Sequence, residues 1–246
     1  MKLLVCVSKT PETTSAINFV DGGKALDTNG LKYIMNPYDE WYALVRALEL
    51  KEAAGGTVVV LNVGPAENDT IIRKALAIGA DEAVRINAEP KSAMATAQMI
   101  AAYAQSESFD AVFCGKETID YNSAEVPAMV AELLDLPYIP LAKGMEVNGN
   151  TAQVTRDIEG GSETVEVDFP FVLSASKGLA EQRIPNMRGI MMAKRKVLNV
   201  VEPGETTDLT LVDLHELPAE KSGVKLIDAD NVEELVRLLK EEAKVI

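Results

Sequence analysis

One segment, residues 111–134, constrains the fold of this chain more than any other. Ala111–Cys114 is a short apolar run typical of a buried strand, Gly115–Val126 is a polar run that opens with glycine, and Pro127–Leu134 has the composition of an apolar helix. In an open α/β sheet such a turn binds phosphate, because free backbone N–H groups and the positive end of the helix dipole point at the ligand. The segment therefore predicts an α/β fold with a nucleotide site at this turn.

The first 140 residues alternate strand and helix patterns. The expected strands are Leu3–Val7, Thr57–Val63, Ala83–Ile86, Ala111–Cys114 and Tyr138–Leu141. The expected helices between them are Asp39–Ala54, Asp69–Ile78 and Lys91–Ala104. Strands that alternate with helices join by right-handed crossovers, which gives a parallel sheet with helices on both faces. We expect a doubly wound, Rossmann-like sheet of the adenine-nucleotide-binding kind.

The pattern changes after Gly144. Met145–Val147 and Thr151–Val154 flank an Asn-Gly turn signal, and two more strands follow at Glu163–Asp168 and Phe171–Ser174. Residues 176–192 have little periodicity, and a polar stretch separates the body from a helix expected at Asn231–Lys244. We predict a nucleotide-binding α/β domain with an antiparallel extension over residues 1–200, and a C-terminal arm over residues 201–246.

Charge and composition limit the partners of this chain. Its net charge is −14, from 24 basic and 38 acidic residues, which argues against nucleic-acid binding. No apolar run approaches membrane-spanning length, so membrane insertion is not expected. Cys6 and Cys114 lie in predicted buried strands and need not pair, which fits a reducing, cytoplasmic location. One stretch opposes the acidic trend, and it is either a solvated loop or a binding surface: Arg183, Arg188, Lys194, Arg195 and Lys196.

Three loops follow strands at what should be the same edge of the sheet. They are Ser8–Thr13, Gly64-Pro65 and Gly115–Asn122, and Asn36–Asp39 can reach the same edge. Their convergence favours an adenine-nucleotide crevice, although neither Walker A nor G-x-G-x-x-G is present.

Conventional catalysis finds little support in the residue types. His215 is the single histidine and lies in a polar segment, so neither a nucleophilic triad nor a transition-metal cage is expected. Asp120 is better explained as a helix cap than as a general base. The chain is expected not to be an enzyme.

Several motifs, in order, resemble one family: the beta (small) subunit of electron transfer flavoprotein. The resemblance covers nearly the whole chain. The motifs are Met35–Glu40, Gly64-Pro65, Ile72–Asp81, Gly115–Asp120, Arg156–Thr164 and Gly189–Lys196.

This resemblance implies a heterodimer with an alpha subunit that carries FAD. The complex accepts electrons from flavin-dependent dehydrogenases and passes them onward, and the beta subunit holds a structural AMP. In electron-bifurcating members a second, redox-active FAD takes the place of AMP and exchanges hydride with NADH. A stand-alone nucleotide-binding module of the same α/β type is a further alternative.

The resemblance also assigns positions in the nucleotide site. Those expected around the adenosine are Cys6, Asn36, Pro37, Tyr38, Asp39 and Val63. Those expected near the phosphate are Gly115, Lys116, Asp120, Asn122, Ser123, Ala124, Glu125 and Val126. AMP-type members usually have Asn-Gln-Thr where this chain has Ala124–Val126, and bifurcating members have Gly-Asp-Thr where it has Tyr121–Ser123. Glu125 repels phosphate unless it turns outward. The identity of the nucleotide therefore stays open.

Partner contacts are implied as well. The family places a leucine that anchors in a partner dehydrogenase where this chain has Met187, and the protruding loop 182–196 is the expected docking element. Arg183, Arg188 and Lys194 are expected to rim that anchor. Arg156 and Asp157 are expected at the interface with the alpha subunit, where the family usually has Glu in place of Asp157.

Overall fold

The computed structural model describes residues 1–207, 215–217 and 223–246, and they belong to two compact units. The larger unit comprises Met1–Ile17 and Asp27–Asp213, and the smaller comprises Asn18–Leu26 and Leu214–Ile246. Part of the polar stretch predicted before the C-terminal helix lies outside the described residues.

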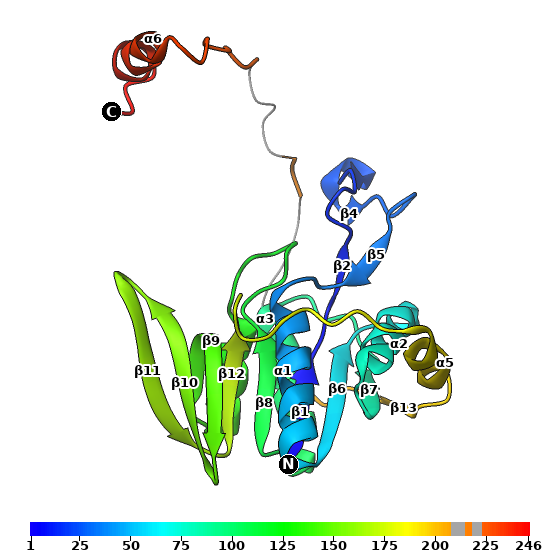
Figure 1. Ribbon diagram of the computed structural model, residues 1–246. Coiled ribbons are helices and arrows are strands. Elements are labelled where there is room, and N and C mark those ends of the chain that lie inside the picture. The colour runs from blue at the N-terminus through cyan, green and yellow to red at the C-terminus, as the bar shows by residue number, and fades with distance from the viewer. Residues whose placement is uncertain (208–214, 218–222) are drawn as a thin grey trace. The chain divides into compact units, whose positions relative to one another are not determined.

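A nine-stranded mixed sheet forms the larger unit, in the order β11-β10-β9-β12-β8-β1-β6-β7-β13 (Figure 1). Its parallel part consists of β1 (Lys2–Cys6), β6 (Thr57–Val63), β7 (Glu82–Ile86), β8 (Ala111–Gly115), β12 (Phe171–Ala175) and β13 (Leu198–Val201), and β9 (Tyr138–Asn148) pairs parallel with β12. The antiparallel extension is β9, β10 (Thr151–Ile158) and β11 (Gly161–Asp168). The predicted α/β class is confirmed.

Helices cover both faces of the parallel part. α1 (Asp39–Ala54) and α2 (Asp69–Ile78) pack on one face, and α3 (Ala93–Ser106) and α4 (Val126–Leu134) on the other. Alternation along β1 shows why: Leu3 and Val5 join the first hydrophobic core, while Leu4 and Cys6 join the second. A strand buried on both faces must be apolar where it is buried, and β1 is apolar at every position after Lys2.

Helix ends follow local sequence signals where those are strong. The predicted bounds of α1 and α2 are confirmed, because Gly55 and Gly79 end them with positive φ. α3 begins at Ala93 instead of Lys91, because the Ser92 hydroxyl accepts from Ala95 N at 3.1 Å and caps the helix there.

Several elements were not predicted. β13 pairs with β7, and β2 (Lys9–Pro11) pairs with β5 (Tyr33–Met35) beside the main sheet. The expectation of one irregular, protruding loop over residues 182–196 is wrong for α5 (Met187–Ala193), a short helix packed on α2. A Cβ at Gly189 would lie 2.4 Å from Ala77 O, so the two backbones touch. The Arg73 guanidinium also donates to Ala193 O at 2.8 Å and to Lys196 O at 2.6 Å.

The smaller unit contains a hairpin and the C-terminal helix. The hairpin joins β3 (Phe19–Val20) to β4 (Ala25–Leu26) through η1 (Asp21–Gly23). The His215 ring stacks on Phe19 with ring centroids 5.0 Å apart, and the backbone N–H of His215 donates to Gly23 O at 2.7 Å. α6 (Val232–Arg237) continues as a π-helical segment, η3 (Leu238–Glu242), so the predicted C-terminal helix is present. No helix among the described residues is long and apolar enough to cross a membrane.

Candidate functional site

A cavity of about 850 Å³ lies at the carboxyl ends of β1, β6 and β8. Here β1 is flanked by β6 on one side and β8 on the other, and the chain crosses from β7 back to β8 (Figure 1). Such a reversal of strand order is a topological switch point, where open α/β sheets bind ligands. The loops predicted to converge contribute Ser8 and Lys9 after β1, Gly64 and Pro65 after β6, and Gly115 at the end of β8 with 116–118 after it.

One wall of the cavity is the loop that leads into α4. Asn122 and Ala124 both have positive φ, 52° and 55°, so the loop turns sharply before the helix. Glu125 is the N-cap of α4 and makes no side-chain capping bond, and its side chain is exposed. The N–H groups of the first helical turn therefore have no side-chain acceptor. Turns of this kind and helix N-termini present backbone N–H groups to anions.

Asp120 does not cap that helix. Its carboxylate accepts from Tyr121 N at 3.0 Å, within its own turn, and the α4 N-cap is five residues later. The prediction of a capping role is therefore wrong, because the loop between Asp120 and α4 is longer than the strand–helix pattern indicated.

The predicted adenosine residues are only partly together. Cys6 and Val63 line the cavity, whereas Asn36, Pro37, Tyr38 and Asp39 do not. Asn36 is buried and holds two loops together: its Nδ2 donates to Glu117 O and its Oδ1 accepts from Ile119 N, both at 3.0 Å. Of the predicted phosphate residues, all line the cavity except Asn122: Gly115, Lys116, Asp120, Ser123, Ala124, Glu125 and Val126.

Glu40 lines the same cavity and was not predicted as a site residue. It is 5% exposed, and its Oε2 accepts from Ser8 N at 2.6 Å. A Cβ at Gly115 would lie 2.6 Å from Glu40 Cγ, so the glycine makes room for this carboxyl group. Burial raises the pKa of Glu40 to about 8; the hydrogen bond from Ser8 opposes this shift, and Asp120 and Asp39 reinforce it. An acidic residue in the first turn of a helix is common, so nothing in the sequence pattern indicated this role.

Two free thiols also line the cavity. Cys6 and Cys114 follow the paired residues Val5 and Phe113 on neighbouring parallel strands, and both are buried and unpaired. A hydrogen bond between Cys6 and Cys114, together with burial, raises the pKa of the Cys6 thiol well above its ordinary value. The Cys6 thiol is thus neutral at physiological pH. Across the described chain, no cluster of three or more His, Cys, Asp or Glu side chains could hold a metal ion.

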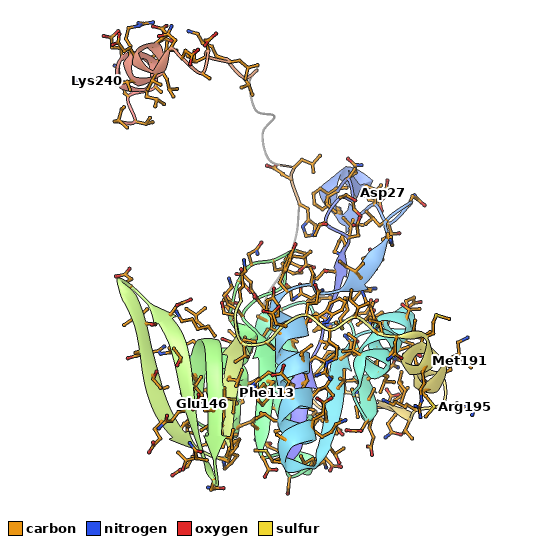
Figure 2. All side chains as sticks on the ribbon, viewed as in Figure 1. Asp27, Phe113, Glu146, Met191, Arg195 and Lys240 are labelled. Carbon is orange, nitrogen blue, oxygen red and sulfur yellow. The ribbon has the colours of Figure 1, made fainter. Side chains whose placement is uncertain are left out.

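The predicted docking residues lie on α5 and on either side of it. Met187 is 74% exposed and Met191 66% exposed, and Arg188 and Lys194 are exposed as well. Figure 2 shows Met191 and Arg195 at the outer surface of the larger unit. Arg183 is different, because its guanidinium donates to both Glu52 oxygens at 2.6 and 3.1 Å and its carbonyl accepts from Trp41 Nε1 at 3.0 Å. Arg183 therefore attaches the segment before α5 to α1.

The two predicted interface residues lie side by side on β10. Arg156 Nε donates to Glu163 on β11 at 2.6 Å, and Asp157 accepts from Lys143 on β9. Both side chains therefore have partners across the antiparallel extension.

Comparisons with known proteins agree on one family. Residues 24–206 match the electron transfer flavoprotein domain. The chain is 37% identical to the electron transfer flavoprotein subunit beta of Bacillus subtilis over the full length of both chains. It is 34% identical to the Syntrophomonas wolfei subunit beta over 94% of this chain and 92% of that one. It is 31% identical to the Homo sapiens subunit beta over 100% and 99%.

Proposed function

The chain belongs to the electron transfer flavoprotein family as a beta subunit, and on that premise we propose that it carries a structural AMP in a heterodimer. The alpha subunit then supplies the FAD, and the complex accepts electrons from flavin-dependent dehydrogenases in the cytoplasm. This chain shapes the flavin environment and docks the donors, and it catalyses no reaction itself.

The cavity at the switch point is the observation that carries this proposal. Its wall at residues 120–126 supplies backbone N–H groups at the start of α4, where the helix dipole favours a phosphate. Because the donors are backbone groups, the unusual side chains of Ala124 and Val126 are compatible with phosphate binding. Glu125 is exposed, so it can point its charge to water and away from the ligand. Cys6 and Val63 supply apolar surface for the adenosine at the ends of β1 and β6.

Nucleotide and flavin counting tests the proposal directly. Protein co-purified with the alpha subunit is denatured, and the released small molecules are identified by mass spectrometry. We expect AMP and one FAD per heterodimer. Two FAD and no AMP would instead establish the electron-bifurcating alternative. A chain that carries a nucleotide and never co-purifies with an alpha subunit would be a stand-alone nucleotide-binding module.

Donor docking is assigned to the exposed side chains of α5. Met187 and Met191 offer unbranched, flexible thioethers that can fill differently shaped pockets. Arg188 and Lys194 surround them with positive charge on an otherwise acidic protein, which favours acidic dehydrogenase surfaces. The packing of α5 on α2 fixes the position of this surface, so it is presented without a large ordering cost.

Contact with the alpha subunit is assigned to the antiparallel extension and to the C-terminal arm. Arg156 and Asp157 lie on β10, and α6 carries the apolar residues Val232, Leu235 and Val236. No described residue of the smaller unit buries these three side chains, which are between 43% and 60% exposed. An apolar stripe left uncovered in this way is typical of a helix that docks on a partner.

A further inference from the structure

Glu40 is a carboxyl group buried in the cavity without a cation. Its Oε2 accepts from Ser8 N, and among the described residues no lysine or arginine lies within salt-bridge distance of it. Lys116, which lines the same cavity, pairs with Glu117 at 2.9 Å. Lys9, another cavity residue, has its Nζ 4.5 Å from the Tyr33 ring centroid. A buried carboxyl group without a countercharge holds its proton.

We propose that nucleotide binding in this cavity requires the proton on Glu40, so that the protein releases its nucleotide as the pH rises. The inference rests on the proposed nucleotide site and adds its regulation. The proton stays on the Glu40 carboxyl in the complex. When Glu40 has lost that proton in the free protein, binding takes one proton from solvent for each nucleotide bound.

The physical cause is repulsion between two negative charges in one enclosed site. A nucleotide phosphate held at α4 and an ionised Glu40 would share a cavity of about 850 Å³, to which Asp120 contributes a further carboxylate. At an effective dielectric constant near 20, two unit charges about 8–10 Å apart repel by about 2 kcal/mol, which corresponds to about a 30-fold loss of affinity. The neutral acid avoids this repulsion.

Other groups that face Glu40 do not account for the same pH dependence. Burial raises the pKa of Asp39, and Lys116 opposes that shift, but Asp39 does not line the cavity. The pKa of the Cys6 thiol is raised well above its ordinary value by Cys114, so it stays neutral in the range in which Glu40 ionises. The hydrogen bond that Lys116 makes to Glu117 raises the pKa of the lysine, so Lys116 keeps its charge.

The pKa of Glu40 in the free protein determines whether nucleotide affinity rises or falls with pH. Glu40 has a pKa of about 8 before the nucleotide binds, and the phosphate raises it further. Affinity is then constant below about pH 7, and above about pH 8 it falls by up to tenfold for each pH unit. AMP itself is a dianion throughout this range, because a phosphate monoester has its second pKa near 6.

Isothermal titration calorimetry of nucleotide-depleted heterodimer tests the proposal. AMP is titrated between about pH 7 and pH 9.5, in pairs of buffers with different ionisation enthalpies, so that the protons taken up are counted. We expect proton uptake to rise towards one per AMP near pH 9, with about 5–10-fold weaker binding there than at pH 7. Adenosine, which carries no phosphate, should bind without this proton uptake.

Two variants identify the responsible group. Glu40→Gln removes the titrating proton, so the affinity for AMP should become independent of pH. Glu89→Gln removes an exposed carboxylate that lines the same cavity, and the pH dependence should persist because water screens that charge. AMP binding by the unaltered protein without proton uptake would overturn the inference and leave the nucleotide site standing. Failure of AMP to bind at any pH would overturn both.

Discussion

Gly115→Ala should disturb the candidate site through a steric clash with the backbone of α1. The glycine ends β8 directly above the start of α1. An added Cβ would lie 2.6 Å from Glu40 Cγ and 2.8 Å from Glu40 N, and the second of these is a backbone atom that no rotamer change can move. The φ of Gly115 is not positive, so the penalty is purely steric.

The size of the penalty follows from overpacking. Inserting a methyl group into a well-packed site costs about 1–3 kcal/mol of folding stability. For a chain of this length each kcal/mol corresponds to about 2–4 °C in Tm, so the shift should be about 2–12 °C. The loop 115–120 must move to relieve the contact. Because Asn36 ties that loop to the start of α1, the move also disturbs the cavity wall and weakens nucleotide binding.

Gly144→Ala is a matched control on the antiparallel extension. A Cβ at Gly144 would meet Thr155 Cβ at 3.6 Å, an ordinary van der Waals contact, so stability and bound nucleotide should be unchanged. Thermal unfolding and mass analysis of released nucleotide measure both variants. Equal melting temperatures and equal nucleotide content for Gly115→Ala and the unaltered protein would refute the steric argument.

Four further outcomes are expected. Met187→Ala should weaken dehydrogenase docking by about 1–2 kcal/mol and slow electron transfer from the donor, without slowing reduction by dithionite; equal slowing of both would contradict docking at α5. Ser123→Pro removes one backbone N–H from the phosphate wall and should reduce AMP affinity by about 1.5–3 kcal/mol in calorimetry, whereas unchanged affinity would place the phosphate elsewhere. Burial raises the pKa of Glu40 to about 8 from 4.5, so the stabilisation from this group is complete below pH 4.5 and is lost as the pH rises to about 8. Glu40→Gln should therefore remove the decrease in the free energy of unfolding, measured with urea, between these two pH values. An unchanged decrease in the variant would assign the pH dependence to another group. Deleting residues 224–246 should leave a folded chain that no longer co-purifies with the alpha subunit, and retained binding would exclude α6 as the contact.

The sequence predicted elements whose signals are local. α1 and α2 end at glycines that can adopt positive φ, and β1 and β6 are apolar at almost every position because both faces are covered. α5 lacked such a signal, because seven residues are too few for a periodic pattern. Its position depends on Arg73 of α2, more than 100 residues earlier in the chain. β13 was missed for a related reason, since an edge strand of four residues with exposed side chains resembles a loop.

The candidate site likewise contains some residues that local sequence signals located and others that only the fold brings together. Its phosphate wall follows one strand directly, so a strand, glycine and helix in sequence were enough to locate it. Glu40 belongs to the site only because Ser8 and Gly115 approach it from two other elements, and Ser8 is 32 residues away in sequence. The Asn36 segment was assigned to the nucleotide because it precedes α1 at the correct edge. Its amide instead bonds to Glu117 and Ile119, so its first role is to position the wall.

The unusual phosphate loop can be understood from the kind of group that the site uses. Side chains at positions 124–126 differ from both common versions of the family motif, yet the donors that the structure offers there are backbone N–H groups. Pro127 removes one of them, since it has no N–H, and leaves those of the preceding residues as the donors to phosphate. A neutral Glu40 then matters more than it would in a site with many donors, because fewer hydrogen bonds offset any negative charge in the cavity. We therefore expect that Ser123→Pro steepens the loss of AMP affinity caused by raising the pH, and that the two effects are not additive.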